Sequence, residues 1–155
     1  MKLDIQQTEL AKTLSILRET ERRLDWPGNR VRSDVGFEKG DWFVGVELLT
    51  ADEEPAKSLQ QLVRPRWSYV GWFGYQGEEG GTPSLAFWLY CGSGEARRKI
   101  ASKLRLRLKG CSIDATRPPE YDEFYLVVTA RRHPFKNDCE WFCNVFRKLG
   151  LPLNE

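Results

Sequence analysis

Two runs of alternating apolar and polar residues, joined by the short turn Lys39-Gly40-Asp41, constrain the fold of this chain most strongly. Successive side chains of a β-strand point to opposite faces of its sheet, so alternation predicts a strand with one buried face. The run from Val31 to Phe37 and the run from Trp42 to Leu48 both have this period. Together they predict a β-hairpin and hence an antiparallel sheet.

A second hairpin is predicted later in the chain. Strand patterns cover residues 66–75 and 84–90, and the glycine-rich segment 77–83 separates them. Two further strand patterns occur near residues 112–115 and 124–132. We therefore expect a mainly antiparallel sheet of about five strands.

Apolar residues at helical spacing predict the other layer of the fold. Leucines recur at intervals of four, three and seven between residues 6 and 25, and a similar apolar stripe runs through residues 138–149. A central helix is expected between Ser93, a suitable N-cap, and Gly110, which ends it. A capping box predicts a further short helix over residues 50–62.

Length and composition indicate a single α+β domain over residues 1–155. A chain of this length buries about 70% of the surface that it exposes when unfolded, enough for a core of its own. No internal repeat, low-complexity tract or long linker divides the sequence, and no apolar run approaches the ~20 residues of a membrane span. The N-terminal residues lack the apolar core of a signal peptide, so we expect a cytoplasmic protein with reduced cysteines.

The central helix concentrates positive charge. Residues 94–110 contain seven Lys and Arg residues and one acid, a net charge of +6 in a chain whose total is +2. Arg98, Ser102, Arg105 and Lys109 repeat with helical spacing on a side away from the apolar stripe, which predicts an exposed cationic ridge. Such a ridge either tracks phosphates or is a charged face that keeps the protein soluble.

The favoured hypothesis is a non-enzymatic protein that binds an anionic macromolecule, either nucleic acid or an acidic protein surface. The glycines beside Ser93 suit an anion at the helix N-terminus, where backbone amides lack intrahelical partners, although plain capping explains the same residues. No base specificity is predicted. The candidate anion-binding residues are Ser93, Gly94, Arg97, Arg98, Lys103, Arg105, Arg107, Lys109, Arg131 and Arg132.

The second hairpin is rich in aromatic residues and supports an alternative. Phe73 and Tyr75 share one face of the strand while Trp72 points to the other, so these rings cannot all enter one core. Packing under helices explains many of them. An exposed subset would stack on bases or anchor a protein partner, as in an inhibitor or immunity-type module. The candidate residues for a protein interface are Trp67, Tyr69, Trp72 and Tyr75.

The segment Leu89-Tyr90-Cys91-Gly92-Ser93-Gly94 carries a resemblance to the acetyltransferase family. Those enzymes place a short glycine-containing turn between a central strand and a helix, where it receives the pyrophosphate of the cofactor. The resemblance covers residues 85–108, and Leu89 occupies the position of the family's leading basic or amide residue. It implies an acyltransferase-like fold as a lesser alternative.

The order helix, three strands, helix, strand is similar to that of the restriction-nuclease superfamily. The resemblance implies an Asp followed by a Glu-x-Lys motif on adjacent strands, which hold a divalent metal. Asp34 and Glu47 match the two acids, but Leu49 stands where the lysine belongs. The comparison therefore implies a nuclease-like scaffold without cleavage activity.

Cysteine and histidine positions predict no metal and no cofactor. Cys139 and Cys143 fall on the apolar stripe of the last helix, where cysteine behaves as a small hydrophobe, and no Cys-x-x-Cys pair accompanies them. Cys91 would be a nucleophile only if the fold placed His133 beside it as a base.

Overall fold

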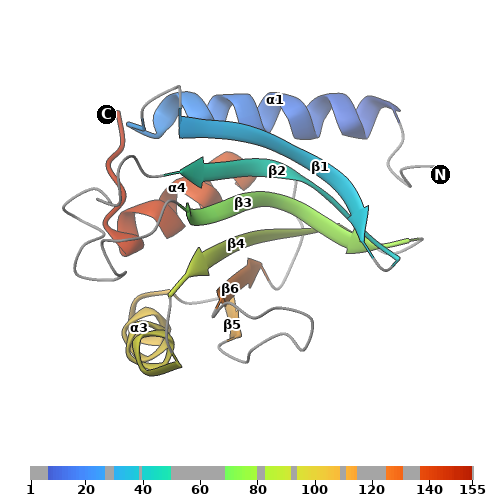
Figure 1. Cartoon of the computed structure of the whole chain (residues 1–155). Coiled ribbons are helices and arrows are strands. Elements are labelled where there is room, and N and C mark those ends of the chain that lie inside the picture. The colour runs from blue at the N-terminus through green and yellow to red at the C-terminus, as the bar shows by residue number, and fades with distance from the viewer. Residues whose placement is uncertain are drawn as a thin grey trace.

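The computed structural model describes residues 7–26, 30–38, 40–49, 69–79, 83–91, 94–108, 111–114, 125–130 and 137–154. The helices within them are α1 (Gln7–Arg23), α3 (Gly94–Arg107) and α4 (Asp138–Leu149). The strands are β1 (Val31–Glu38), β2 (Asp41–Leu49), β3 (Tyr69–Glu78), β4 (Ser84–Tyr90), β5 (Cys111–Asp114) and β6 (Tyr125–Ala130). The predicted α+β fold is confirmed, with six strands in place of about five (Figure 1).

All six strands form one antiparallel sheet in the order β1-β2-β3-β4-β6-β5. The two predicted hairpins are present, and their registers pair Val35 with Val44 and Phe73 with Phe87. β6 lies between β4 and β5 and pairs Val128 with Phe87. The edges of the sheet are therefore β1 and the four-residue β5.

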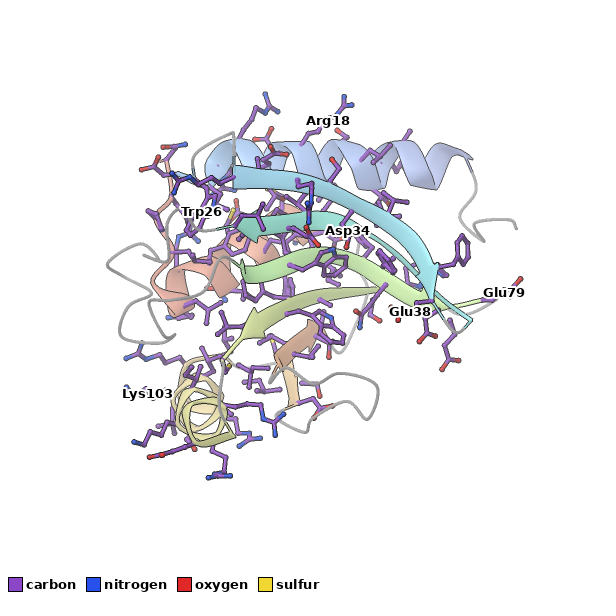
Figure 2. All side chains as sticks on the ribbon, in the orientation of Figure 1. Arg18, Trp26, Asp34, Glu38, Glu79 and Lys103 are labelled. Atoms are coloured by element: carbon purple, nitrogen blue, oxygen red, sulfur yellow. The ribbon has the colours of Figure 1, made fainter. Side chains whose placement is uncertain are left out.

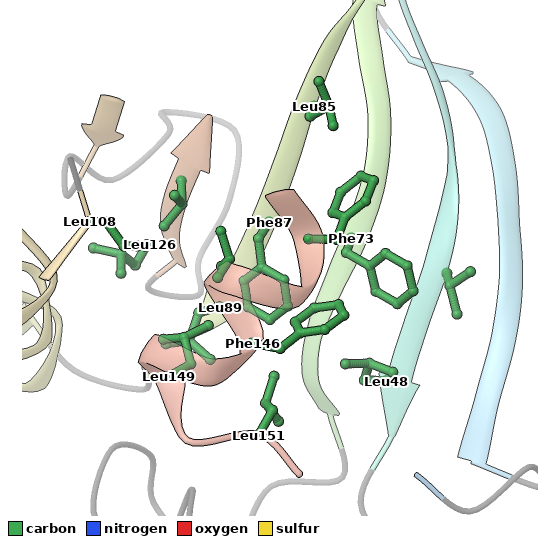
Figure 3. Close-up of a cluster of buried hydrophobic side chains, with 14 of the residues drawn as sticks. Leu48, Phe73, Leu85, Phe87, Leu89, Leu108, Leu126, Phe146, Leu149 and Leu151 are labelled. Carbon is green, nitrogen blue, oxygen red and sulfur yellow. The ribbon is translucent and has the colours of Figure 1, made fainter. Parts of the chain in front are cut away.

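The core lies between the sheet and α4, which passes behind the strands in the view of Figure 1. The ring centroid of Phe146 is 5.1 Å from that of Phe73 and 5.7 Å from that of Phe87, and both contacts are edge to face. This geometry is favoured because the positive edge of one ring meets the negative face of the other. Leucines of β2, β4 and α4 surround these rings (Figure 3). Each such side chain contributes roughly 1.5–3 kcal/mol by leaving water.

On the opposite face of the sheet, a tryptophan ring lies against the backbone of glycine residues. Gly45 and Gly74 are paired neighbours on β2 and β3. A Cβ atom added to Gly45 would lie 2.3 Å from the ring of Trp72, so the glycine leaves the space that this indole fills. On β4, Trp88 pairs with Trp72 and donates a 2.8 Å hydrogen bond from Nε1 to the side chain of Gln76.

Residues 151–154 bind the C-terminal end of α1. The backbone N–H of Asp25 donates to the Pro152 carbonyl, and the backbone N–H of Asn154 donates to the Arg23 carbonyl, each at 2.8 Å. The side-chain amide of Asn154 donates to the Arg22 carbonyl at 3.1 Å. Both accepting helix carbonyls belong to the last turn, whose carbonyls lack intrahelical partners.

The predicted segments agree with the structure for β4 and α4 and differ elsewhere. β3 continues to Glu78, whereas the loop was expected to begin at Gly77. The reason is packing, because Gly77 pairs with Trp42 and a Cβ atom there would lie 3.1 Å from the Trp42 ring. The helix expected over residues 50–62 lies outside the described residues. Among the described helices, none has the length and apolar character needed to cross a membrane.

Candidate nucleic-acid interface

α3 packs its apolar side against the β5 and β6 end of the molecule (Figure 1). Ile100, Leu104 and Leu108 are buried and follow one another at intervals of four, which places them on one side of the helix. An acidic residue in the first turn and arginines in the last turn suit the helix dipole. The buried stripe therefore fixes which side of α3 faces outward.

The outward side of α3 is cationic. From Arg98 to Arg107 the charged positions span about 14 Å of helix axis, at a rise of ~1.5 Å per residue. Figure 2 shows Lys103 projecting from the helix away from the sheet. We call this surface the basic face of α3; its exposed residues are Arg98, Lys99, Ser102, Lys103, Arg105, Leu106 and Arg107.

Little of this charge is neutralised within the described part of the chain. Glu95 lies 3.0 Å from Lys99, but both side chains are more than 70% exposed, and solvent screens such pairs until they contribute little. Arg98, Lys103 and Arg105 make no ion pair with any described residue. The basic face is therefore open to an external anion.

Arg97 differs from the other cations of α3 because it is half-buried. Its charge lies near the thiol of Cys91, whose pKa burial raises to about 12 while Arg97 opposes the rise. Cys91 is completely buried at the end of β4 and stays protonated at neutral pH, so it is not an available nucleophile. His133, its suggested base, falls outside the described residues.

Several predicted site residues are not covered by the structural description, and their roles stay predictions. For Gly94 and Tyr69 the structure gives the backbone position, in α3 and β3. The residues outside the described ranges are Ser93, Lys109, Arg131, Arg132 and Trp67.

Two of the four aromatic candidates for the alternative protein interface, Trp72 and Tyr75, are buried in the structure. Tyr75 is 0% exposed and lies under α4, where its hydroxyl donates a 2.7 Å hydrogen bond to Asp138. Trp72 is 5% exposed on the opposite face, where its ring covers Gly45 and Gly74. Strand alternation correctly predicts that the two rings lie on opposite faces of the sheet. Both are nevertheless buried, because each face of the sheet has its own packing partners.

Asp34 and Glu47 lie close together on β1 and β2, as the nuclease comparison requires (Figure 2 labels Asp34). Burial raises the pKa of Asp34 and the Glu47 carboxylate raises it further, whereas Arg32 and the indole N–H of Trp72 oppose the rise. Glu47 accepts a 2.8 Å hydrogen bond from Nε of Arg32. The described residues contain no group of three His, Cys, Asp or Glu side chains able to hold a metal ion. Glu47 is the hydrogen-bond partner of Arg32, which is paired with it on the neighbouring strand.

The exposure of Leu106 is not among the features predicted from the sequence. This side chain is 82% exposed in the middle of the basic face. Helical spacing could have revealed it, because Leu106 lies two residues from Leu104 and so falls off the buried stripe. An apolar side chain among cations gives the basic face a mixed chemical character.

Comparisons of the chain with protein-family models, with curated proteins and with solved structures found no match. The resemblances to acetyltransferases and to restriction nucleases therefore stay expectations.

Proposed function

We propose that this protein is a non-enzymatic, cytoplasmic nucleic-acid-binding protein that contacts the phosphate backbone through the basic face of α3. The observation that carries the proposal is the row of exposed cations between Arg98 and Arg107, few of which form ion pairs with the residues that the structure describes. Phosphates attract such cations, and binding releases the counterions that had condensed on the nucleic acid.

The expected contacts position the nucleic acid without reading its sequence. Arginine presents a planar fork of N–H donors that suits phosphate oxygens, and lysine acts as a flexible point charge. Neither contact distinguishes one base from another. We therefore expect similar affinity for unrelated sequences, with strong dependence on salt.

A salt titration tests the proposal. Binding of two unrelated DNA and RNA oligonucleotides would be measured by fluorescence anisotropy for the unmodified protein, Arg98→Ala and Arg105→Ala. Each variant should reduce the slope of log affinity against log salt by about one unit on every sequence. Arg18→Ala removes an exposed arginine of α1 and is the matched control, with the slope unchanged (Figure 2 labels Arg18). Absence of binding at about 50 mM salt, where counterion release is strong, would refute the proposal.

Leu106 favours a second candidate, an acidic protein partner with an apolar pocket. A phosphate backbone offers nothing to an exposed leucine, whereas protein interfaces combine apolar anchors with charged rims. Leu106→Ser separates the two functions, because it should leave nucleic-acid affinity unchanged within twofold. The same change should weaken a protein complex much more than a single rim charge does.

A further inference from the structure

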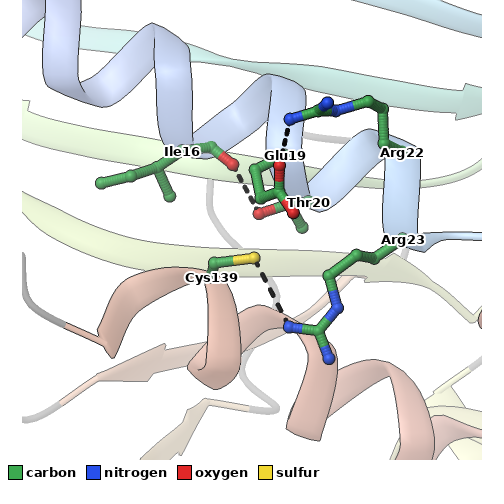
Figure 4. A network of polar contacts seen from close by, with 6 residues as sticks. All are labelled: Ile16, Glu19, Thr20, Arg22, Arg23 and Cys139. Carbon is green, nitrogen blue, oxygen red and sulfur yellow. Dashed lines mark hydrogen bonds and ion pairs between the residues drawn. The ribbon is translucent and has the colours of Figure 1, made fainter. Parts of the chain in front are cut away.

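A cysteine pair on α4 faces an arginine of α1, away from the basic face. In Figure 4, Arg23 reaches from the end of α1 to Cys139 on α4, and its Nη1 lies 3.8 Å from the sulfur. The same guanidinium forms an ion pair with Glu140. Arg23 thus bridges α1 and α4 and places a cation beside a thiol.

Cys139 has the environment in which reactive thiols are found. It is partly exposed, whereas Cys91 and Cys143 are completely buried. It is the second residue of α4, so it lies at the positive end of the helix dipole as well as beside the guanidinium. The thiolate is the form through which sulfur attacks, and reactive cysteines are found at partly exposed sites near cations.

Cys143 lies one helical turn further along α4, on the same side of the helix as Cys139. Burial and the charge of Cys139 together raise the pKa of Cys143 to about 11, while Arg23 opposes the rise. Two acids share this region. Glu140 is engaged by Arg23, and the carboxyl of Asp138 is buried against Tyr75. A partly exposed thiol therefore has a second, buried thiol one helical turn away.

We propose that Cys139 and Cys143 form a reversible dithiol switch that hydroperoxides oxidise. The Cys139 thiolate attacks the outer oxygen of the peroxide, the O–O bond breaks, and an alcohol or water leaves. Cys139 becomes a sulfenic acid. Cys143 then attacks that sulfur, a disulfide bond forms, and water leaves with the sulfenic oxygen. The two thiols lose two electrons in total, and the peroxide gains them.

Closing this disulfide requires a local change in α4. Side chains four residues apart on a helix have Cβ atoms ~5–6 Å apart, whereas a disulfide needs about 3.5–4.5 Å. The first turn of α4 therefore has to open: the N-cap residue Asn137 makes no side-chain capping hydrogen bond that would resist this, and the hydrogen bond from Tyr75 to Asp138 has to break or shift. Opening this turn would also displace Glu140 from Arg23, so oxidation is expected to loosen the contact between α1 and α4.

Competitive alkylation of the intact protein tests the assignment without any substitution. Limiting iodoacetamide followed by peptide mass spectrometry gives the relative rate at each cysteine. Cys139 should react about tenfold faster than Cys111, a half-buried cysteine on β5 that serves as the internal reference. Equal rates at the two cysteines, or preferential alkylation of Cys111, would refute the role of Cys139.

Peroxide treatment tests the switch itself. In the unmodified protein, the free thiols of Cys139 and Cys143 should both disappear, and the mass should fall by that of two hydrogen atoms. Dithiothreitol should restore the two thiols and the original mass. Cys143→Ser should stop at a sulfenic acid that dimedone traps on Cys139, and Cys139→Ser should not react. Cys111→Ser is the matched control and should behave like the unmodified protein. Over-oxidation of Cys139 without a disulfide in the unmodified protein would contradict the proposal, and so would thiol loss that persists in Cys139→Ser.

Discussion

The hydroxyl of Tyr75 donates a 2.7 Å hydrogen bond to Oδ2 of Asp138, which joins the middle of β3 to the first residue of α4. Both side chains are almost completely buried, at 0% and 2% exposure. Burial raises the pKa of Asp138 and the Tyr75 hydroxyl opposes the rise, because an N–H or O–H donor stabilises the carboxylate. The pair therefore sets the position of α4 on the sheet and satisfies a buried acid.

Tyr75→Phe should reduce the free energy of unfolding by about 1–3 kcal/mol, because it keeps the ring but leaves a buried carboxyl without its donor. Urea denaturation measures the change. Ser84→Ala, which removes a long 3.4 Å hydrogen bond at a partly buried site, should change stability by less than about 0.5 kcal/mol. Equal effects of the two variants would contradict the importance of the Tyr75 contact.

Asp138→Asn should alter how stability depends on pH. Because the pKa of Asp138 is raised in the folded protein, its favourable contribution is complete below the ordinary value of 3.8 and is lost as pH rises through the raised value. The amide keeps an acceptor for Tyr75 but does not ionise. The unmodified protein should therefore lose stability relative to Asp138→Asn as pH rises from the ordinary pKa of 3.8 through the raised value. Urea titrations across that range give the difference, and a constant difference would contradict the raised pKa.

Neighbouring residues of α3 should respond very differently to truncation. Leu104→Ala removes a buried aliphatic side chain and should cost about 2–5 kcal/mol. Arg105→Ala removes an exposed one and should change stability by less than about 0.5 kcal/mol. Thermal and urea unfolding measure both. A large loss in Arg105→Ala would show that its side chain supports the fold rather than the basic face.

Gly45→Ala should destabilise the sheet by about 1–3 kcal/mol, because the added Cβ would lie 2.5 Å from the Phe73 carbonyl oxygen and 2.3 Å from the Trp72 ring. Gly36→Ala is the matched comparison. There the added Cβ meets the tip of the half-exposed Phe43 ring at 2.8 Å, and that ring can move aside. Unfolding midpoints should therefore fall further for Gly45→Ala, and the reverse order would refute the packing argument.

Local patterns predicted the elements of this fold well. The bounds of α4 follow from its apolar stripe and from Gly150, whose left-handed backbone at φ 80° ends the helix. Hairpins follow from strand alternation because the pairing partners are close in sequence. The placement of β6 between β4 and β5 depends on pairings between distant segments, which local periodicity does not encode.

The candidate site shows the same difference between features that lie within one segment and features that depend on distant segments. Helical spacing identifies the exposed side of α3 because the buried stripe lies within the same segment. It cannot show that Trp72 and Tyr75 are both buried, since alternation separates the faces of a strand but does not reveal what covers them. The contact between Arg23 and Cys139 joins residues 116 positions apart and carries no local signal.

The attachment of residues 151–154 to the end of α1 has a consequence for the kinetics of folding. Asn154 and Arg22 are 132 positions apart, so this contact closes one of the longest loops that the chain can form. Closing a loop costs conformational entropy before the contact stabilises the chain, so contacts between residues far apart in sequence slow folding. During synthesis α1 emerges long before its partners, and its last turn stays without these bonds until the ribosome has released residue 154. Docking of α1 is therefore expected to be a late folding event, and stopped-flow folding should show its protection from hydrogen exchange arising after that of the β1–β2 hairpin.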